Sequence, residues 1–243
     1  MSLASSIATV PCVRVHCRFG AAAVAKGQHV SFFEVDLPAA SQKKRELVEA
    51  LFSPSAYPRP AYVAADLAAV PLMDALEAAA VGFDRSKPAL FTVEGLVYYL
   101  PGGSVARLLG GIAARAAPGS RVAFDFLSRD VLDGVRAAPA YKVTARSVAN
   151  KGEPFISGLP DSPDGVQAFF DGPVREAAAK AAAAGAAGAD TPPQRLQLQE
   201  FVDAKEMAAR QLPHLVWPEP GTKAPPPMLS FYSFASAEVV AAS

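Results

Sequence analysis

Residues 88–94 read Pro-Ala-Leu-Phe-Thr-Val-Glu, a short apolar run that closes on the carboxylate of Glu94. Aromatic and β-branched residues in a run of this length are typical of a buried β-strand. Three further segments are also short apolar runs that end near an acid. They are residues 29–36 with Asp36, 61–66 with Asp66 and 121–126 with Asp125. The acids recur about every 30 residues, the length of a strand, a covering helix and two turns, so the sequence predicts a parallel sheet.

The segments between these strands carry apolar residues at helical spacing. We expect helices over residues 40–52, 71–80 and 103–116, the first with Leu47, Val48 and Leu51 on its buried side. Strands that alternate with helices predict an α/β fold class, here a Rossmann-like, mostly parallel sheet with helices on both faces. Strong alternation over residues 228–236 predicts one last strand.

The length of 243 residues suits one domain, and 51% hydrophobic residues are enough to form its core. The strand-and-helix rhythm stops after residue 126, and we expect residues 127–227 to form a helical lid or insertion. This region includes an alanine-rich tract and a segment with helical spacing over residues 199–212. The whole chain is therefore predicted to be a single domain with an insertion.

The charge pattern narrows the possible partners. Lys plus Arg and Asp plus Glu balance at 23 each without a basic stripe, so we expect no nucleic-acid partner. No apolar run approaches the roughly 20 residues of a membrane span, so we expect no membrane partner and a cytoplasmic location. The first 33 residues contain no acid, a composition that organelle transit peptides share, so organelle targeting is the alternative. The oligomeric state is not predicted.

Cys12, His16 and Cys17 lie close together near the N-terminus. A tetrahedral zinc site would need a second pair of Cys or His residues downstream, and the sequence has none at a suitable spacing. We therefore expect no metal site.

The acids at the strand ends are the first candidates for a binding site. In an open parallel sheet, ligands bind beyond the carboxyl ends of the strands, so Asp36, Asp66, Glu94 and Asp125 are expected along one edge. A single acid in such a place often only caps the next helix. Four acids along the same edge of the sheet favour a cationic or hydroxyl-rich ligand.

Three segments together resemble one family. Phe-Glu-Val-Asp-Leu-Pro at 33–38, Tyr-Val-Ala-Ala-Asp-Leu at 62–67 and above all Glu-Gly-Leu-Val-Tyr-Tyr-Leu-Pro at 94–101 are similar to the leucine carboxyl methyltransferases and their bacterial relatives. The similarity runs from about residue 30 to residue 159. It implies a class I methyltransferase fold with S-adenosyl-L-methionine as cofactor.

The resemblance also implies roles for single residues. Asp36 would accept hydrogen bonds from the ribose hydroxyls, as an acid at this place does in nucleotide folds generally. Asp66 would receive the adenine amino group, and the Leu67 backbone N–H would reach a ring nitrogen. Glu94 would face the methionine end of the cofactor, and Tyr99 would line the floor between cofactor and acceptor. No catalytic residue is assigned.

The implied activity is an O-methyltransferase that acts on a carboxyl or hydroxyl oxygen of a small molecule or a peptide C-terminus. A carboxylate acceptor is already ionised at neutral pH, whereas a hydroxyl needs a general base. Because no His lies near the motifs, the sequence favours a carboxyl acceptor.

The N-terminus departs from the family. Its members carry a Gly-x-Gly loop before the strand that ends in Glu-Val-Asp, but residues 9–21 here contain only Gly20 and no Asp. Residues 1–28 are thus atypical, and a truncated gene start, a pseudoenzyme and a divergent enzyme are the competing explanations. The alternative function is a catalytically inactive, methyltransferase-like binding module. An NAD-dependent dehydrogenase would share the sheet and Asp36, but the motif at 94–101 has no place in that chemistry.

Overall fold

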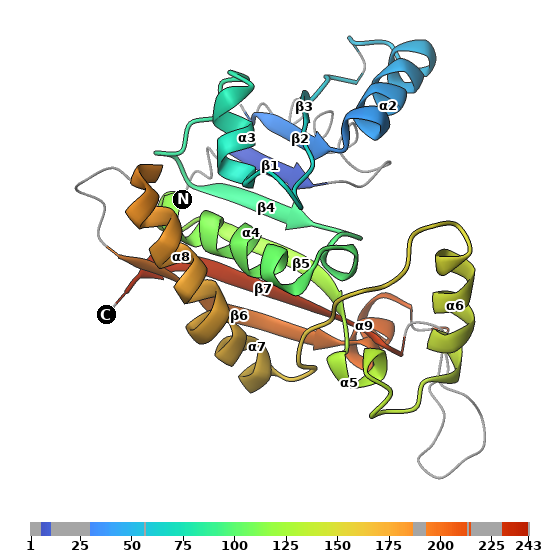
Figure 1. Ribbon diagram of the computed structural model, residues 1–243. Coiled ribbons are helices and arrows are strands. Elements are labelled where there is room, and N and C mark those ends of the chain that lie inside the picture. The colour runs from blue at the N-terminus through green and yellow to red at the C-terminus, as the bar shows by residue number, and fades with distance from the viewer. Residues whose placement is uncertain are drawn as a thin grey trace.

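The computed structural model describes residues 6–10, 30–55, 57–186, 193–212, 214 and 230–242 (Figure 1). Seven strands in this part of the chain form one sheet in the order β3-β2-β1-β4-β5-β7-β6. They are β1 (Ser6–Val10), β2 (Phe32–Asp36), β3 (Ala61–Ala64), β4 (Ala89–Val93), β5 (Arg121–Leu127), β6 (Gln194–Asp203) and β7 (Tyr232–Ala241). The pairs among β1 to β5 are parallel, whereas β7 is antiparallel to both β5 and β6. The predicted α/β class is confirmed, and the sheet is mixed.

Two strands differ from the prediction. The last strand, expected over residues 228–236, is β7, which begins at Tyr232 and ends at Ala241. The helix expected over residues 199–212 is wrong over residues 199–203, because β6 continues to Asp203 and helix α9 (Ala204–Gln211) follows it. The Asp203 side chain caps α9 by accepting from the Glu206 backbone N–H.

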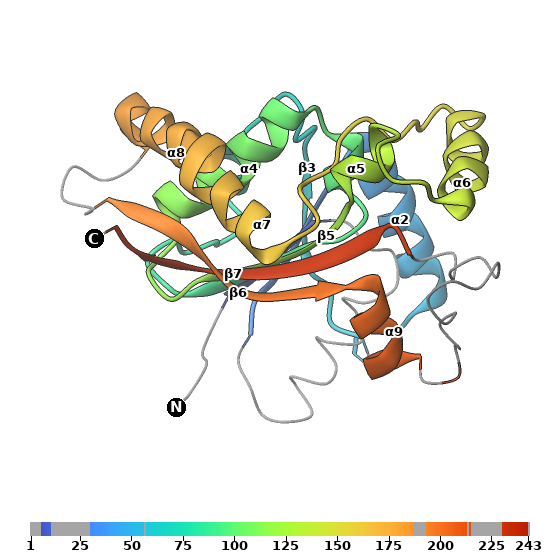
Figure 2. The same ribbon diagram turned by 90° about the horizontal axis from the view of Figure 1, so that it is seen from below.

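The core lies between the sheet and a layer of helices. Helix α4 (Gly102–Arg115) packs beside α8 (Arg175–Ala181), which continues from α7 (Pro163–Phe169) through the π-helical turn η2 (Phe170–Val174). Figures 1 and 2 show α4, α7 and α8 over one face of the sheet, with α9 on the other side of β6. The sheet side chains beneath α4 are closed to solvent, among them Phe91, Val93, Val122, Phe124 and Val239.

Helix α2 (Pro38–Leu51) presents a different face from the expected one. Val48 is buried, but Leu47 and Leu51 are 50% and 70% exposed. Lys44 is buried instead, because its ammonium forms an ion pair at 2.6 Å with Glu34, a buried acid on β2. The face of α2 that is turned to the sheet therefore carries Lys44, whose ammonium compensates the buried charge of Glu34.

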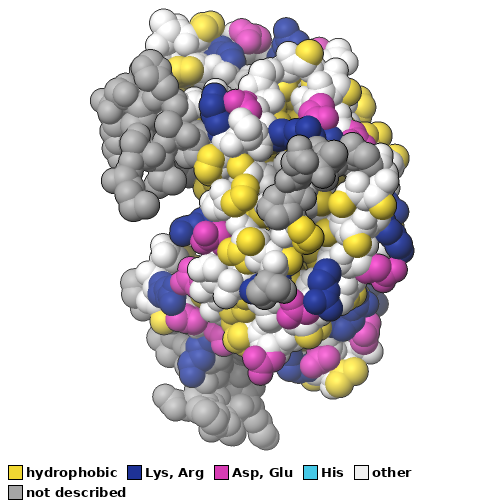
Figure 3. Space-filling model, turned by 90° about the vertical axis from the view of Figure 1, so that its left-hand side faces the viewer, with side chains coloured by type: hydrophobic (Ala, Val, Ile, Leu, Met, Phe, Trp, Pro, Cys, Tyr) yellow, Lys and Arg dark blue, Asp and Glu magenta, His cyan; other side chains and the backbone are white. Residues whose placement is uncertain are grey.

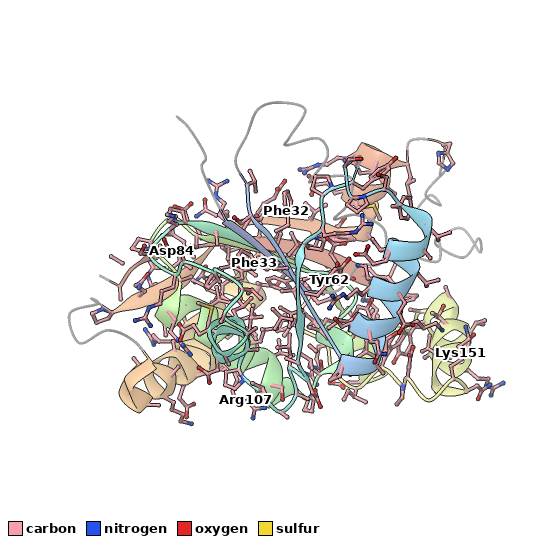
Figure 4. The ribbon with its side chains drawn as sticks, turned by 90° about the horizontal axis from the view of Figure 1, so that it is seen from above. Phe32, Phe33, Tyr62, Asp84, Arg107 and Lys151 are labelled. Carbon is pink, nitrogen blue, oxygen red and sulfur yellow. The ribbon has the colours of Figure 1, made fainter. Side chains whose placement is uncertain are left out.

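The edge strand β3 lies beside β2, with Tyr62 on β3 and Phe32 and Phe33 on β2 (Figure 4). Helix α3 (Leu72–Ala78) connects β3 to β4 and buries Leu72, Met73 and Leu76. Phe33 packs edge-on against Phe83 with ring centroids 5.5 Å apart.

The region expected to form a lid, residues 127–227, has several parts. Helices α5 (Arg129–Leu132) and α6 (Pro139–Ala149) lie beyond the arrowheads of the strands in Figure 1. They pack on a small aromatic cluster with the 3-10 turn η1 (Val97–Tyr99). The segment from α7 to the π-helical η3 (Ala182–Ala186) instead packs along α4. Strand β6 is part of the sheet.

Basic and acidic side chains are interspersed on the face that Figure 3 shows, in keeping with the balanced charge of the sequence. Within the described ranges, no helix is both long and apolar enough to cross a membrane. In the same residues, no group of three or more His, Cys, Asp or Glu side chains is arranged to hold a metal. Cys12, His16, Cys17 and the atypical segment 11–28 lie outside the described residues.

Candidate functional site

The acids named from the sequence lie along one edge of the sheet. Asp36 ends β2 and pairs with Ala64, so Asp66 lies just beyond the neighbouring strand end. On the other side of β1, Glu94 directly follows β4, whose Val93 pairs with Val10 of β1. Since all these strands are parallel, their carboxyl ends meet at the same edge. This edge is the candidate site.

A compact turn follows β3 and carries Asp66 and Leu67. One Asp66 oxygen accepts from the Ala68 backbone N–H at 2.9 Å, and Arg107 of α4 donates to the Ala68 carbonyl at 2.8 Å. Leu67 is buried and anchors the turn in the core. No residue of the described part of the chain accepts from the Leu67 backbone N–H. The turn therefore presents a carboxylate and a backbone donor side by side.

Asp36 lies between this turn and the centre of the sheet. Its Oδ1 accepts from the Leu37 backbone N–H at 2.7 Å, and its carbonyl accepts from Ala65 N–H at 2.9 Å. Burial raises the pKa of Asp36, the Leu37 hydrogen bond opposes this, and the charge of Glu34 adds to the rise. The strand end and the turn after β3 are thus connected, with the Asp36 carboxylate at the edge.

The chain turns sharply after Glu94. Gly95 has φ of 67°, a left-handed conformation that glycine adopts without strain. Its backbone N–H donates to Oδ1 of Asp125 on β5 at 2.7 Å. Val93 of β4 pairs with Phe124 of β5. The next residue on each strand is Glu94 and Asp125, so these two acids are cross-strand neighbours on the same face.

Asp125 has an unusual electrostatic environment. Burial raises its pKa most, the hydrogen bond from Gly95 opposes the rise, and the charge of Glu94 adds to it. No cation in the described residues forms an ion pair with either carboxylate. A carboxylate without a basic partner among the described residues, such as Glu94, favours a cationic ligand, which also relieves its repulsion from Asp125.

The two tyrosines after Glu94 differ in exposure. Tyr98 is 7% exposed, and its hydroxyl lowers the pKa of its neighbours Asp125 and Tyr232. Burial raises the pKa of Tyr98 well above its ordinary value, so it is a neutral core residue. Tyr99 is half-buried at the same edge, and its ring lies 5.7 Å from that of Phe155. Its proposed place beside the cofactor stays a prediction.

A hollow of about 430 Å³ opens on the sheet face that α4 does not cover. Its lining includes Thr92, Glu94, Asp125, Glu200 and Phe234. Glu200 forms an ion pair at 2.6 Å with Arg210 of α9, so its charge is partly neutralised. Glu94 therefore stands where the edge of the sheet and this hollow meet.

Sequence reasoning counted Asp125 among the four strand-end acids of the site but gave it no individual role, and in the structure β5 continues past it to Leu127. Its contact with Gly95 joins residues 30 positions apart in sequence. The glycine after Glu94 is the one signal of a tight turn that the sequence carries there.

Comparisons with known proteins agree with this geometry. The sequence profile of the leucine carboxyl methyltransferase family matches residues 22–113. A protein of Streptomyces avermitilis is 39% identical over 89 residues, which cover 36% of this chain and 28% of that protein. One of Mycolicibacterium smegmatis is 38% identical over 103 residues, 41% of this chain and 32% of that protein. Both carry the provisional name of S-adenosyl-L-methionine-dependent methyltransferase, and the matched segments span about a third of their length or less.

Solved structures extend the likeness to the fold of the whole chain. A DUF574 family protein of Streptomyces avermitilis superposes with a TM-score of 0.55 at 15% identity, covering 96% of this chain and 74% of the other. A protein of Thermobifida fusca, provisionally described as a methyltransferase, gives 0.54 at 18% identity and covers 98% and 74%. At these identities the likeness establishes the fold alone.

Proposed function

We propose, from the match of residues 22–113 to the leucine carboxyl methyltransferase family, that this chain binds S-adenosyl-L-methionine and transfers its methyl group to an oxygen atom. The parallel strands β1 to β5 would form the Rossmann-like, cofactor-binding part of the sheet. Helices α5 and α6, beyond the carboxyl ends, would form the lid. The residues proposed to hold the cofactor are Asp36, Asp66, Leu67, Glu94 and Tyr99.

The observation that carries this proposal is the convergence of the acids on one edge. Asp36, Asp66 and Glu94 follow three parallel strands that share this edge. The cofactor has a ribose with two hydroxyls, an adenine amino group and a cationic methionine end. The strand order β3-β2-β1-β4 supports one carboxylate for each group along the cofactor, with Asp66 for the adenine, Asp36 for the ribose and Glu94 for the methionine end.

The described residues fit this cofactor at both ends. At the adenine end, the Asp66 carboxylate and the Leu67 N–H supply the acceptor and donor that an aminopurine edge needs. At the methionine end, the Glu94 carboxylate has no basic partner among the described residues and suits a cationic group, while Asp125 holds the turn beside it. When bound, the cofactor supplies an already activated methyl group. The protein's task is then mainly to hold the acceptor in line and exclude water.

The alternative function is a catalytically inactive, methyltransferase-like binding module. It is motivated by residues 9–21, where the family's Gly-x-Gly loop is missing from the sequence. Backbone that approaches a ligand closely needs glycine, and bulky Arg14 and His16 stand in that stretch. Binding without methyl transfer to any acceptor would favour this reading.

The acceptor is proposed to be a carboxyl or hydroxyl oxygen of a small molecule or a peptide C-terminus. The three sequence motifs contain no His that would serve as a general base, and this favours a carboxyl group. The acid-lined hollow beside Glu94 favours a hydroxyl, because a second carboxylate there would be repelled. A methyl-transfer assay with matched acids and alcohols decides between them.

Isothermal titration of the purified chain tests the proposal. We expect saturable binding of S-adenosyl-L-methionine at one site and no comparable binding of NAD. No saturable binding up to millimolar cofactor would contradict the proposal for this chain. Preference for NAD would instead support a dehydrogenase, which shares the sheet and an acid after the second strand.

A further inference from the structure

The turn that presents Glu94 is held from the neighbouring strand. The β4–β5 ladder reaches Val93 and Phe124 and goes no further. Beyond it, the Gly95 N–H has turned away from the path of a strand, and the carboxylate of Asp125 accepts its hydrogen bond at 2.7 Å. A side-chain oxygen thus extends the contact between the two strands by one step past the last registered pair.

Asp125 is itself fixed in place. Phe124 and Phe126, on either side of it, are buried in the main core, so the backbone of Asp125 has little freedom. Tyr98, whose hydroxyl lowers the pKa of this carboxyl, is enclosed by the rings of Tyr99, Phe155 and Tyr232. The acceptor for Gly95 is therefore positioned by packing on two sides.

The turn is also held from a third direction. The Tyr98 carbonyl accepts from the Ile156 backbone N–H at 2.8 Å, and the Ser157 hydroxyl donates to the Val97 carbonyl at 2.6 Å. These bonds fix the end of the turn, whereas the bond from Gly95 fixes its start. The start is the part that sets the direction of Glu94.

We propose that Asp125 is a positioning residue for the methionine end of the cofactor, acting through the Gly95 N–H to fix the direction of Glu94. This inference rests on the proposed function, since it assumes that Glu94 meets the cofactor. In this role Asp125 positions the turn through its acceptor oxygen, and its charge matters less. A protonated carboxyl or an amide in the same place would serve as well.

Two conservative substitutions separate geometry from charge. Asp125→Asn keeps an acceptor oxygen at the same distance from the backbone and removes the charge. Asp125→Glu keeps the charge and moves the carboxylate outward by one methylene. We expect Asp125→Asn to bind S-adenosyl-L-methionine within about threefold of the unaltered chain, and Asp125→Glu to bind it about tenfold or more weakly. The reverse order would overturn the proposal in favour of direct charge contact, and equal affinities for all three chains would overturn it as well.

A double-mutant cycle shows whether Asp125 acts through Glu94. In a Glu94→Gln background, Asp125→Glu should cause little further loss of affinity, because the group that it positions has already lost its charge. Fully additive losses would contradict the coupling. Far-UV circular dichroism and thermal unfolding of each variant identify any that fail to fold. If the unaltered chain does not bind the cofactor at all, the proposed function fails first, and this inference fails with it.

Discussion

Glu94 follows directly on a strand that is closed to solvent, since Phe91 and Val93 of β4 are 0% exposed. A carboxylate on so rigid a support loses little conformational entropy when it meets a cation. Hydrogen bonds to charged groups contribute about 1.5–3 kcal/mol, roughly a ten- to hundredfold effect on affinity. The amide of glutamine has the same shape but no charge, so the substitution isolates this contribution.

We therefore expect Glu94→Gln to weaken the binding of S-adenosyl-L-methionine at least about tenfold with little change in unfolding temperature. Titration calorimetry measures the first and a thermal melt the second. Glu176→Gln is the matched control, since Glu176 is exposed on α8, pairs with Lys180 and should leave binding unchanged. Equal affinity of Glu94→Gln and the unaltered chain would remove Glu94 from the site.

The raised pKa of Asp125 predicts a pH dependence of stability. A carboxyl whose pKa is higher in the folded than in the unfolded chain contributes stability that is complete below the ordinary value of 3.8. This contribution is lost as the pH rises through the raised pKa. Asparagine does not titrate, so the stability of the unaltered chain minus that of Asp125→Asn should fall between acid and neutral pH. The fall is at most about 1.4 kcal/mol per pH unit within that window.

Urea unfolding of both chains from acid to neutral pH measures this difference. A difference that stays constant across the range would show that the burial and the neighbouring Glu94 do not raise the pKa of Asp125 in solution. A stability difference that grows with pH would mean that folding lowers the pKa of Asp125. This result is expected if a cation outside the described residues stabilises the carboxylate.

Among the elements, the contact between α4 and α8 offers a test with a control one residue away. A Cβ built on Gly110 would lie 2.8 Å from the Ala177 Cβ and from the Ala178 N, and 2.9 Å from the Val174 carbonyl oxygen. A Cβ on Gly111 would meet nothing within 4 Å. We expect Gly110→Ala to destabilise the protein by about 1–3 kcal/mol through overpacking. Gly111→Ala should be neutral or stabilise by up to about 1 kcal/mol, since alanine is the better helix former.

Urea unfolding again gives the two free energies. Similar values for both alanine variants would mean that α4 and α8 do not pack as closely as described. The cofactor affinity of both variants should stay unchanged, because this contact is remote from the edge that carries Asp36 and Glu94.

Some elements could be predicted from the sequence and others could not, for identifiable reasons. Strands β2 to β5 are apolar runs of four to seven residues that end near an acid, and buried parallel strands have this composition. Strand β6 is an edge strand rich in Gln, and a register shift between Leu198 and Glu200 breaks its alternation. Its pattern therefore has neither a clear period of two nor a buried run. The exposed face of α2 was missed because the Lys44–Glu34 ion pair is a tertiary contact.

The candidate site divides in the same way. Asp36, Asp66 and Glu94 could be placed on one edge because parallel strands and their ends follow from local patterns. The contact from Gly95 to Asp125 depends on which strands are neighbours, and local pattern does not carry strand order. The same holds for Arg107, whose bond to the Ala68 carbonyl supports the turn with Leu67 from a helix 39 residues away.

At the scale of the molecule, the proposed site spans five strands, so a bound cofactor would connect the outer strand β3 with the central β4 and β5. A ligand that binds only the folded chain stabilises it by about 2.7 kcal/mol at a concentration one hundred times its dissociation constant. For a domain of this size, each kcal/mol raises the unfolding temperature by about 2–4 °C.

We therefore expect saturating S-adenosyl-L-methionine to raise the unfolding temperature of the whole chain by about 5–10 °C in a single cooperative transition. Helix α2 lies on the side of the sheet formed by β2 and β3, and few apolar side chains hold it. Without a bound cofactor, we expect this side of the sheet to unfold first. Differential scanning calorimetry distinguishes the outcomes. An unchanged melting curve contradicts binding, and a shift of only part of the transition would mean that the two ends of the site belong to separate cooperative units. At the same cofactor concentration, Glu94→Gln should show a smaller shift than the unaltered chain, because the stabilisation follows the affinity of the methionine end.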